Sequence, residues 1–139
     1  MTTSAIELLK TGLRRASAVI AIATFLAIAT SAFADDSKRQ GSFKGLNNHT
    51  TNGTATLVKS ADGYVIELGK DFMFDGAPDP KVAFGKDGQF DAATLLEPLR
   101  ANSGAQSYVV PDTINPEDFN EIYIWCEKYS VGLGVASIK

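Results

Sequence analysis

From Gly41 onward, short apolar or alternating runs follow one another, separated by clusters of Gly, Asn, Asp and Pro. Runs of roughly four to eight residues with a period of two, bounded by such residues, are typical of β-strands. Asp62-Gly63 separates two of these runs, and because both central residues of a type I′ turn need positive φ, the pair predicts a hairpin of that type. The expected strands span residues 41–44, 53–59, 64–68, 81–85, 107–110, 120–126 and 131–138.

Two segments interrupt this β pattern. Residues 76–80, Gly-Ala-Pro-Asp-Pro, are expected to form a loop, because the prolines lack amide donors and restrict the residues before them. Residues 92–99 predict one or two helical turns, with Asp91 as the N-cap and Pro98 as the limit. The pattern therefore predicts an all-β, single-domain fold, either an antiparallel β-sandwich or a barrel-like sandwich.

The N-terminal residues have the features of a secretory signal peptide. Three basic residues precede an uncharged apolar stretch at 16–32, which ends in the small-residue site Ala32-Phe33-Ala34. This stretch is shorter than the roughly 20 residues that a membrane span needs, so an uncleaved anchor is the second interpretation. We expect a signal peptide at 1–34, a polar tether at 35–40 and the β domain at 41–139, with no membrane span after cleavage and a periplasmic or secreted location.

The net charge of the domain that remains after cleavage limits the classes of partner that it can bind. Removing residues 1–34 takes Lys10, Arg14 and Arg15 from the 13 basic residues and Glu7 from the 16 acidic ones, which leaves 10 basic and 15 acidic residues and a net charge of −5. An acidic domain gains no attraction from phosphates, so we expect neither nucleic acid nor an anionic membrane surface as partner.

Few residues are suited to chemistry. The chain has one histidine, His49, and one cysteine, Cys126. Blue-copper and ordinary zinc sites need more ligands of these types, so no metal site is expected. The C-x-x-C-H motif for covalent haem attachment and the glycine motifs that cradle phosphates are missing from the sequence.

Cys126 lies in the strand-like run Ile-Tyr-Ile-Trp-Cys-Glu at 122–127. In a regular strand it shares a face with Ile122 and Ile124, while Tyr123 and Trp125 point to the other face. A buried small apolar side chain and a reactive or ligating thiol both remain open. Lys128 is the one nearby basic residue that the sequence offers, on the same face if the strand continues. The two glycines in the next strand, Gly132 and Gly134, permit close approach of backbone or ligand, and a bulge or tight packing of a neighbouring aromatic side chain is the preferred explanation.

His49 lies in an Asn- and Gly-rich segment, residues 45–53, which predicts a loop or turn. A loop histidine can act as a ligand or an acid–base group, or it can be solvated and locally hydrogen-bonded. A Cys–His catalytic pair is a further alternative, since both residue types are present.

Several separated phrases of the chain, at residues 41–45, 71–72, 76–82, 104–111 and 124–136, occur together in a distinctive order, with Trp125-Cys126 the most specific among them. In these phrases the chain resembles the DM-thirteen domain over essentially residues 41–138. The resemblance implies an extracytoplasmic β-sandwich-like module that acts in electron transfer. It also implies Cys126 as redox centre, either as a free thiol or as a ligand to a prosthetic group such as haem, and His49 as the matching histidine.

Three functional hypotheses follow. The first is extracytoplasmic electron transfer or thiol redox chemistry through Cys126, with an unknown redox or protein partner, as a redox component rather than a stand-alone enzyme. The second is a non-catalytic binding module that recognises a protein or glycan, in which Cys126 is buried. The third is a thiol hydrolase that uses Cys126 and His49, ranked last because no oxyanion hole or third residue is recognisable.

Overall fold

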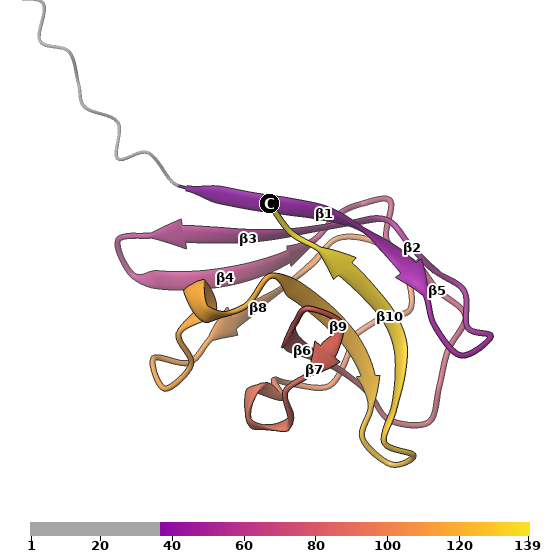
Figure 1. Ribbon diagram of the computed structural model, residues 1–139. Helices are drawn as coiled ribbons and strands as arrows, with labels where there is room; N and C mark the ends of the chain where they lie inside the picture. Colours follow the sequence, from indigo (N-terminus) through magenta and orange to yellow (C-terminus); the bar gives the residue numbers. More distant parts are fainter. Residues whose placement is uncertain (1–36) are drawn as a thin grey trace, which may run out of the picture. The chain divides into compact units, whose positions relative to one another are not determined.

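The computed structural model describes residues 37–139, which form one curled antiparallel sheet of eight strands and a separate two-stranded sheet (Figure 1). The strand order in the large sheet is β7-β6-β9-β10-β1-β3-β4-β8, and β2 pairs with β5. Two short 3-10 helices, η1 and η2, complete the structure. The elements are β1 (Lys38–Gly45), β2 (Thr51–Asn52), β3 (Thr54–Ser60), β4 (Gly63–Leu68), β5 (Met73–Phe74), β6 (Pro80–Lys86), β7 (Gln89–Phe90), η1 (Ala92–Thr94), β8 (Gln106–Val110), η2 (Pro116–Asp118), β9 (Glu121–Cys126) and β10 (Val131–Ser137).

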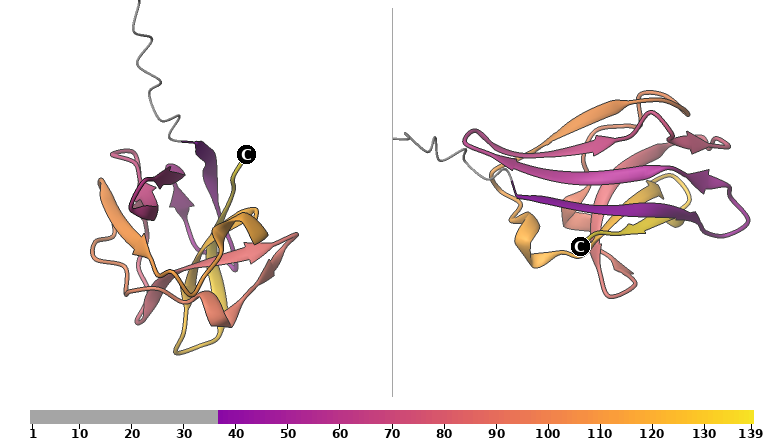
Figure 2. Two further views of the ribbon diagram at one scale, coloured as in Figure 1. Left: turned by 90° about the vertical axis from the view of Figure 1, so that its left-hand side faces the viewer. Right: turned by 90° about the horizontal axis from the view of Figure 1, so that it is seen from above.

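Strand β1 joins the two halves of the large sheet. Its first part, from Lys38 to Ser42, pairs with β3, and its last part, from Phe43 to Gly45, pairs with β10. The sheet therefore folds over along β1 into a half-barrel, whose inner faces enclose the core (Figure 2). The prediction of an all-β, barrel-like antiparallel domain is confirmed.

The core is built from alternate residues of both halves, as a period of two requires. Leu57, Ile66 and Tyr108 come from one half, and Val82, Phe84 and Ile124 from the other, all of them at most 2% exposed. Burial of apolar surface on this scale is the main force that holds the two halves together.

An irregular segment, residues 96–101, closes the gap between the two outermost long strands, β6 and β8. On the β6 side the contacts are backbone hydrogen bonds, from Leu96 N to Val82 O and from Leu99 N to Pro80 O, both 2.8 Å. Pro98 also forms an isolated bridge with Lys81. The segment therefore occupies the position that a further strand beside β6 would have, but it does not form a regular strand.

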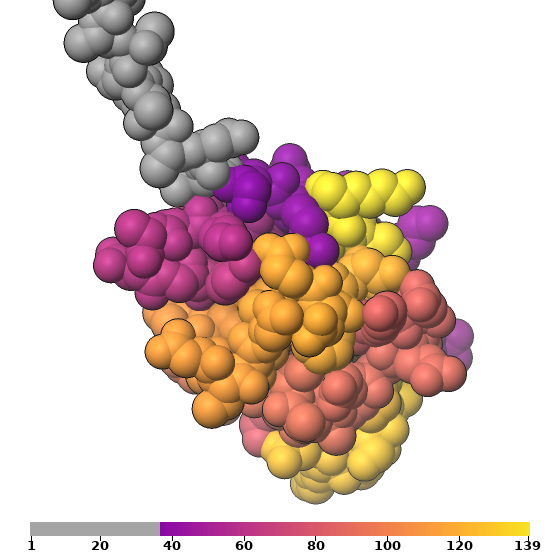
Figure 3. Space-filling view, turned by 60° about the vertical axis from the view of Figure 1, so that its left-hand side comes forward, coloured from indigo at the N-terminus to yellow at the C-terminus, as the bar shows by residue number. Residues whose placement is uncertain are grey.

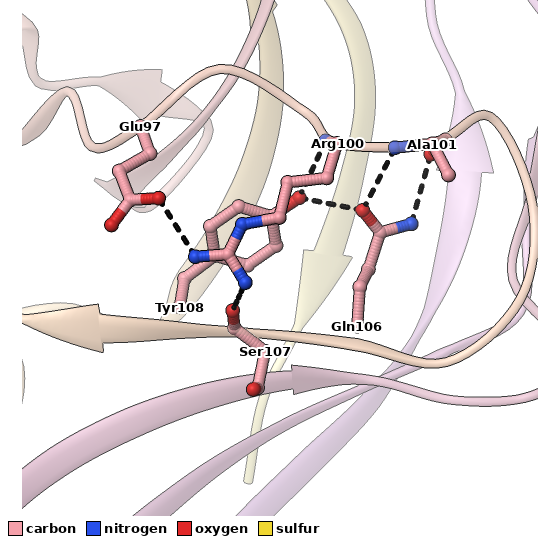
Figure 4. Close-up of polar contacts among 6 residues, drawn as sticks. All are labelled: Glu97, Arg100, Ala101, Gln106, Ser107 and Tyr108. Atoms are coloured by element: carbon pink, nitrogen blue, oxygen red, sulfur yellow. Dashed lines mark hydrogen bonds and ion pairs between the residues drawn. The ribbon is translucent and has the colours of Figure 1, made fainter.

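Side chains hold the same segment to β8 (Figure 4). The Tyr108 hydroxyl accepts a hydrogen bond from Arg100 N at 3.0 Å and donates one to Gln106 Oε1 at 2.6 Å. The Gln106 amide binds both backbone groups of Ala101, and Arg100 Nη1 donates to Ser107 O at 2.8 Å. The Tyr108 hydroxyl lies in the buried interior, and this burial raises its pKa.

One end of the half-barrel is covered by η2. Arg39 Nη2 donates to the carbonyl oxygens of Pro116 and Phe119, at 3.0 and 2.9 Å, and the Phe119 ring stacks on Phe84. Figure 3 shows the orange segment around η2 packed between the magenta β3–β4 hairpin and the salmon segment of β6 and β7.

All seven expected strands are present, within three residues of the expected bounds. Strand β1 begins at Lys38 rather than Gly41, so three residues expected in the tether pair with β3 instead. The expected signal peptide and the start of the tether lie outside the described residues. The short strands β2, β5 and β7 were not predicted.

Two local predictions need comment. The type I′ turn at Asp62-Gly63 is wrong: Ser60 pairs with Gly63, so Ala61 and Asp62 are the turn residues, and only Gly63 has positive φ, at 119°. The β3–β4 register runs unshifted to this two-residue turn, and the positive φ falls on the glycine that follows it. The helical segment is a single 3-10 turn at η1, where Asp91 is the N-cap as predicted and accepts a hydrogen bond from Ala93 N.

Candidate functional site

Cys126 is the last residue of β9 and faces the core. Its side chain shares the inner face with Ile122 and Ile124, as the alternation predicts, and the residue is only 1% exposed. Its register partners are Pro80 on β6 and Val131 on β10. The sole thiol of the chain is therefore free but shielded from solvent at the end of a strand.

Backbone and ionic contacts hold the chain around Cys126. Glu127 N donates to Asp79 O at 3.2 Å, which ties the β9–β10 turn to the loop before β6. Lys81 forms an ion pair with Glu127, and its Nζ lies 3.8 Å from Asp79 Oδ1. We call Lys81, Asp79 and Glu127 the clasp. Lys81 lies far from Cys126 in the sequence, so no local pattern predicts that it lies near the thiol.

Lys128 does not have the position that the sequence suggested. Strand β9 ends at Cys126, so Lys128 belongs to the turn, and its Nζ lies over the Tyr129 ring, 5.5 Å from the centroid. The prediction that Lys128 continues the thiol face of the strand is wrong, because the chain turns before reaching it.

His49 is held by a carboxylate rather than by the thiol. It ends a tight turn in which Asn47 and Asn48 have positive φ, and its Nδ1 lies 2.9 Å from Asp75 Oδ1. The other Asp75 oxygen accepts a hydrogen bond from Thr50 N at 2.9 Å. The Thr50 amide and then His49 lower the Asp75 carboxyl pKa below its usual value. Within residues 37–139, His49 and Cys126 share no hydrogen bond. A Cys–His hydrolase needs its histidine within hydrogen-bond reach of the thiol, so this arrangement does not support one.

The surroundings of Cys126 do not fit haem. An axial ligand needs an open space for the macrocycle beside the ligating atom, but Cys126 is packed among core residues. The Nδ1–Asp75 contact of His49 carries no such argument, because a ligating histidine commonly binds through Nε2 while a carboxylate holds Nδ1. Three surface grooves of the domain are lined by other residues. Within the described part of the chain, no group of three or more His, Cys, Asp or Glu residues could hold a metal ion.

The opposite face of β9 carries an aromatic cluster, consisting of Phe90, Tyr123 and Trp125. The Phe90 and Trp125 rings are stacked, with centroids 3.7 Å apart and an angle of 6° between their planes. Tyr123 packs edge-on against both, at 6.2 and 6.5 Å. The parity of β9 predicted the position of Tyr123 and Trp125, whereas Phe90 comes from the unpredicted strand β7.

An open groove of about 690 Å³ lies beside this cluster, and we call it the outer groove. Phe90 and Trp125 contribute aromatic surface, and Leu46, Val135 and Gly132 complete the apolar lining. A Cβ atom at Gly132 would lie 3.0 Å from Leu46 Cδ1 and 3.7 Å from the Trp125 ring, so the glycine permits their close approach. Between Gly132 and Gly134 the β9–β10 register shifts, so the predicted bulge is confirmed.

Comparison with known proteins gives one match. The family described as electron transfer DM13, the same DM-thirteen family that the sequence resembles, matches residues 42–138. No curated protein and no solved structure matches the chain. Among residues 37–139, no helix is long and apolar enough to cross a membrane. The family match covers most of the chain and almost all of the described β domain, and it indicates a role in electron transfer. The chain therefore belongs to the DM13 electron-transfer family.

Proposed function

We propose that the domain is an electron-transfer component that acts through the thiol of Cys126, by exchange with a disulfide of a partner protein. In this step the Cys126 thiolate attacks one sulfur of the partner disulfide, a mixed disulfide forms, and the second partner sulfur leaves as a thiolate. One observation supports a free thiol over a haem ligand: Cys126 is packed among core residues, which leaves no space for the macrocycle beside its sulfur.

The observation that carries this proposal is the position of Cys126 at the end of β9. Strand ends and turns open at much lower free energy than core strands, so a thiol there can be reached without unfolding the domain. Pro80, its partner on β6, has no N–H to donate to β9. The turn that follows, residues 127–130, is held to the neighbouring loop by the clasp.

The test is the reaction of folded protein with oxidised glutathione, followed by intact mass. We expect one glutathione adduct per chain, formed at a rate that stays nearly constant at low urea, because local opening exposes little surface. Cys126→Ala removes the adduct and serves as control. If the rate instead follows global unfolding across the urea range, the thiol is a core residue and the proposal fails.

The second candidate is a non-catalytic binding module, favoured by the 1% exposure of Cys126. In that case Cys126 only packs, and Cys126→Ala and Cys126→Ser should differ mainly in stability. A buried serine hydroxyl without a partner costs about 1–3 kcal/mol, so Ser should be the less stable of the two. Partner binding unchanged in Cys126→Ala would favour this candidate.

We also propose that the domain works outside the cytoplasm, in the periplasm or as a secreted protein. The support is the basic and apolar pattern of residues 1–34 with its Ala-Phe-Ala site. Expression of the full chain in a bacterial host, fractionation and intact mass test this. A mature form that begins at Asp35 in the periplasm or medium is expected, and a full-length cytoplasmic product would contradict it.

A further inference from the structure

The aromatic cluster lies on the side of the sheet that faces water. The outer face of an antiparallel sheet usually carries polar side chains, while its inner face packs on the core. Here Phe90, Tyr123 and Trp125 gather on the outer face, and Phe90 and Trp125 remain partly exposed. Grouped aromatic side chains at a partly open surface are typical of a binding site.

The size of the outer groove fits a small molecule. Its volume of about 690 Å³ lies within the range of roughly 300–1,000 Å³ found for small-molecule sites. Part of its lining is flat, because Gly132 has no side chain and lies against the Trp125 ring. A flat ligand can therefore contact the groove over a large part of its area.

The charge of the groove excludes anionic ligands. Glu121 is the only Asp, Glu, Lys or Arg residue that lines the groove, and its Oε2 accepts hydrogen bonds from Gly88 N at 2.9 Å and from the Tyr123 hydroxyl at 3.4 Å. A phosphate or carboxylate ligand would meet no cation to pair with. An organic cation could lie over one aromatic face, but the proposed electron-transfer function calls for a ligand that accepts and releases electrons, which selects a redox-active ring instead.

We propose that the outer groove binds a neutral, flat, conjugated ring of the quinone class, as a small-molecule electron carrier for this domain. The ring stacks against the Phe90–Trp125 pair, an arrangement that adds to plain burial of apolar area. Gln89 and Ser130 on the groove wall supply donors for the ligand carbonyl oxygens. This inference rests on the proposed electron-transfer function, because a redox role selects quinones among neutral ring compounds.

Fluorescence tests the inference directly, because Trp125 is the only tryptophan of the chain. The probe is tetramethyl-1,4-benzoquinone, which has no free ring position where the Cys126 thiol could add. We expect saturable quenching of Trp125, whereas free N-acetyltryptophanamide shows only the linear, collisional effect. Linear quenching in the protein as well would overturn the proposal.

Two matched variants locate the binding. Val135→Glu places a charged side chain in the groove and should raise the dissociation constant by about tenfold or more, because the charge loses solvation beside the ring. Val109→Glu makes the same change on β8, at a residue 70% exposed that does not line the groove, and should leave binding unchanged. Equal binding by both variants would overturn the site.

The same titration on Cys126→Ala separates this inference from the proposed function. Saturable quenching in Cys126→Ala, together with a wild-type thiol that reacts only on global unfolding, would reject thiol exchange and keep the groove. Linear quenching together with rapid glutathione addition would reject the groove and keep thiol exchange.

Discussion

Removing the ammonium group of Lys81 is expected to speed modification of Cys126 in the folded protein. Lys81 joins the loop before β6 to the turn after β9, through Asp79 and Glu127, and these two segments flank the thiol. The change is Lys81→Met, which keeps most of the apolar stem and removes the charge. Without the clasp, the turn opens more often, and each opening exposes Cys126.

The size of the effect follows from the exposure of the clasp. The side chains of Lys81, Asp79 and Glu127 are 21, 34 and 47% exposed, so solvent screens both pairs. Pairs of this kind contribute about 0.2–1 kcal/mol. Since 1.36 kcal/mol is a tenfold change in an equilibrium constant, the opening constant should rise about 1.4- to 5-fold. The free energy of global unfolding should fall by no more than the same amount, about 0.2–1 kcal/mol.

A maleimide reagent in excess measures the rate of thiol labelling in native buffer. When closing is faster than labelling, the rate is proportional to the opening constant. Wild-type protein in about 1 M salt should approach the rate of Lys81→Met, because salt screens exposed pairs. Lys86→Met is the matched control, since Lys86 lies at the other end of β6 and forms no ion pair within residues 37–139. Identical rates in wild type and Lys81→Met, insensitive to salt, would refute the role of the clasp.

Three further predictions concern stability. Gly134→Ala should destabilise the domain by about 1–3 kcal/mol in urea unfolding, because the new Cβ would lie 2.6 Å from the buried Thr51 side chain; unchanged stability would contradict the packing. Tyr108→Phe should lower the free energy of unfolding by about 1–3 kcal/mol in the same assay, because it leaves the part-buried Arg100 N–H without its partner. An unchanged free energy of unfolding would mean that water replaces the hydroxyl. The pKa of the Asp75 carboxyl is lowered in the folded protein, so its charge stabilises the domain above the usual carboxyl pKa of about 3.9, and this contribution disappears as the pH falls through the folded pKa. The stability difference between wild type and Asp75→Asn should therefore shrink over that acid range. A stability difference independent of pH would contradict this role of Asp75.

Alternation along the chain was sufficient to predict the long strands and, in β9, the face on which the side chains lie. In β9 it placed Ile122, Ile124 and Cys126 inside and Tyr123 and Trp125 outside, because a strand has a period of two whatever it pairs with. The two-residue strands β2, β5 and β7 are too short to show any period. The turn at Asp62 depends on which residues pair across the hairpin, and the sequence alone does not determine that register.

The partners of the candidate residues could not be predicted, because they come from distant parts of the chain. Asp75 reaches His49 through the β2–β5 pairing, and Lys81 reaches Glu127 because β6 lies beside β9. Such contacts depend on strand order in the sheet, which local patterns do not contain. The family resemblance supplied the electron-transfer role but also suggested haem, which the packing around Cys126 does not accommodate.

The two proposed sites lie on opposite faces of one strand, and this makes them experimentally separable. Cys126 and Trp125 are consecutive, so their Cα atoms are about 3.8 Å apart, yet one faces the core and the other the outer groove. A one-residue slip of β9 would exchange the two faces and bury the ring while exposing the thiol. The bulge between Gly132 and Gly134 opposes such a slip, because it lets Leu133 enter the core while Gly132 stays beneath Trp125. Cys126→Ala and Val135→Glu change side chains on opposite faces at positions that are not register partners, so these two variants should act independently, with effects that add.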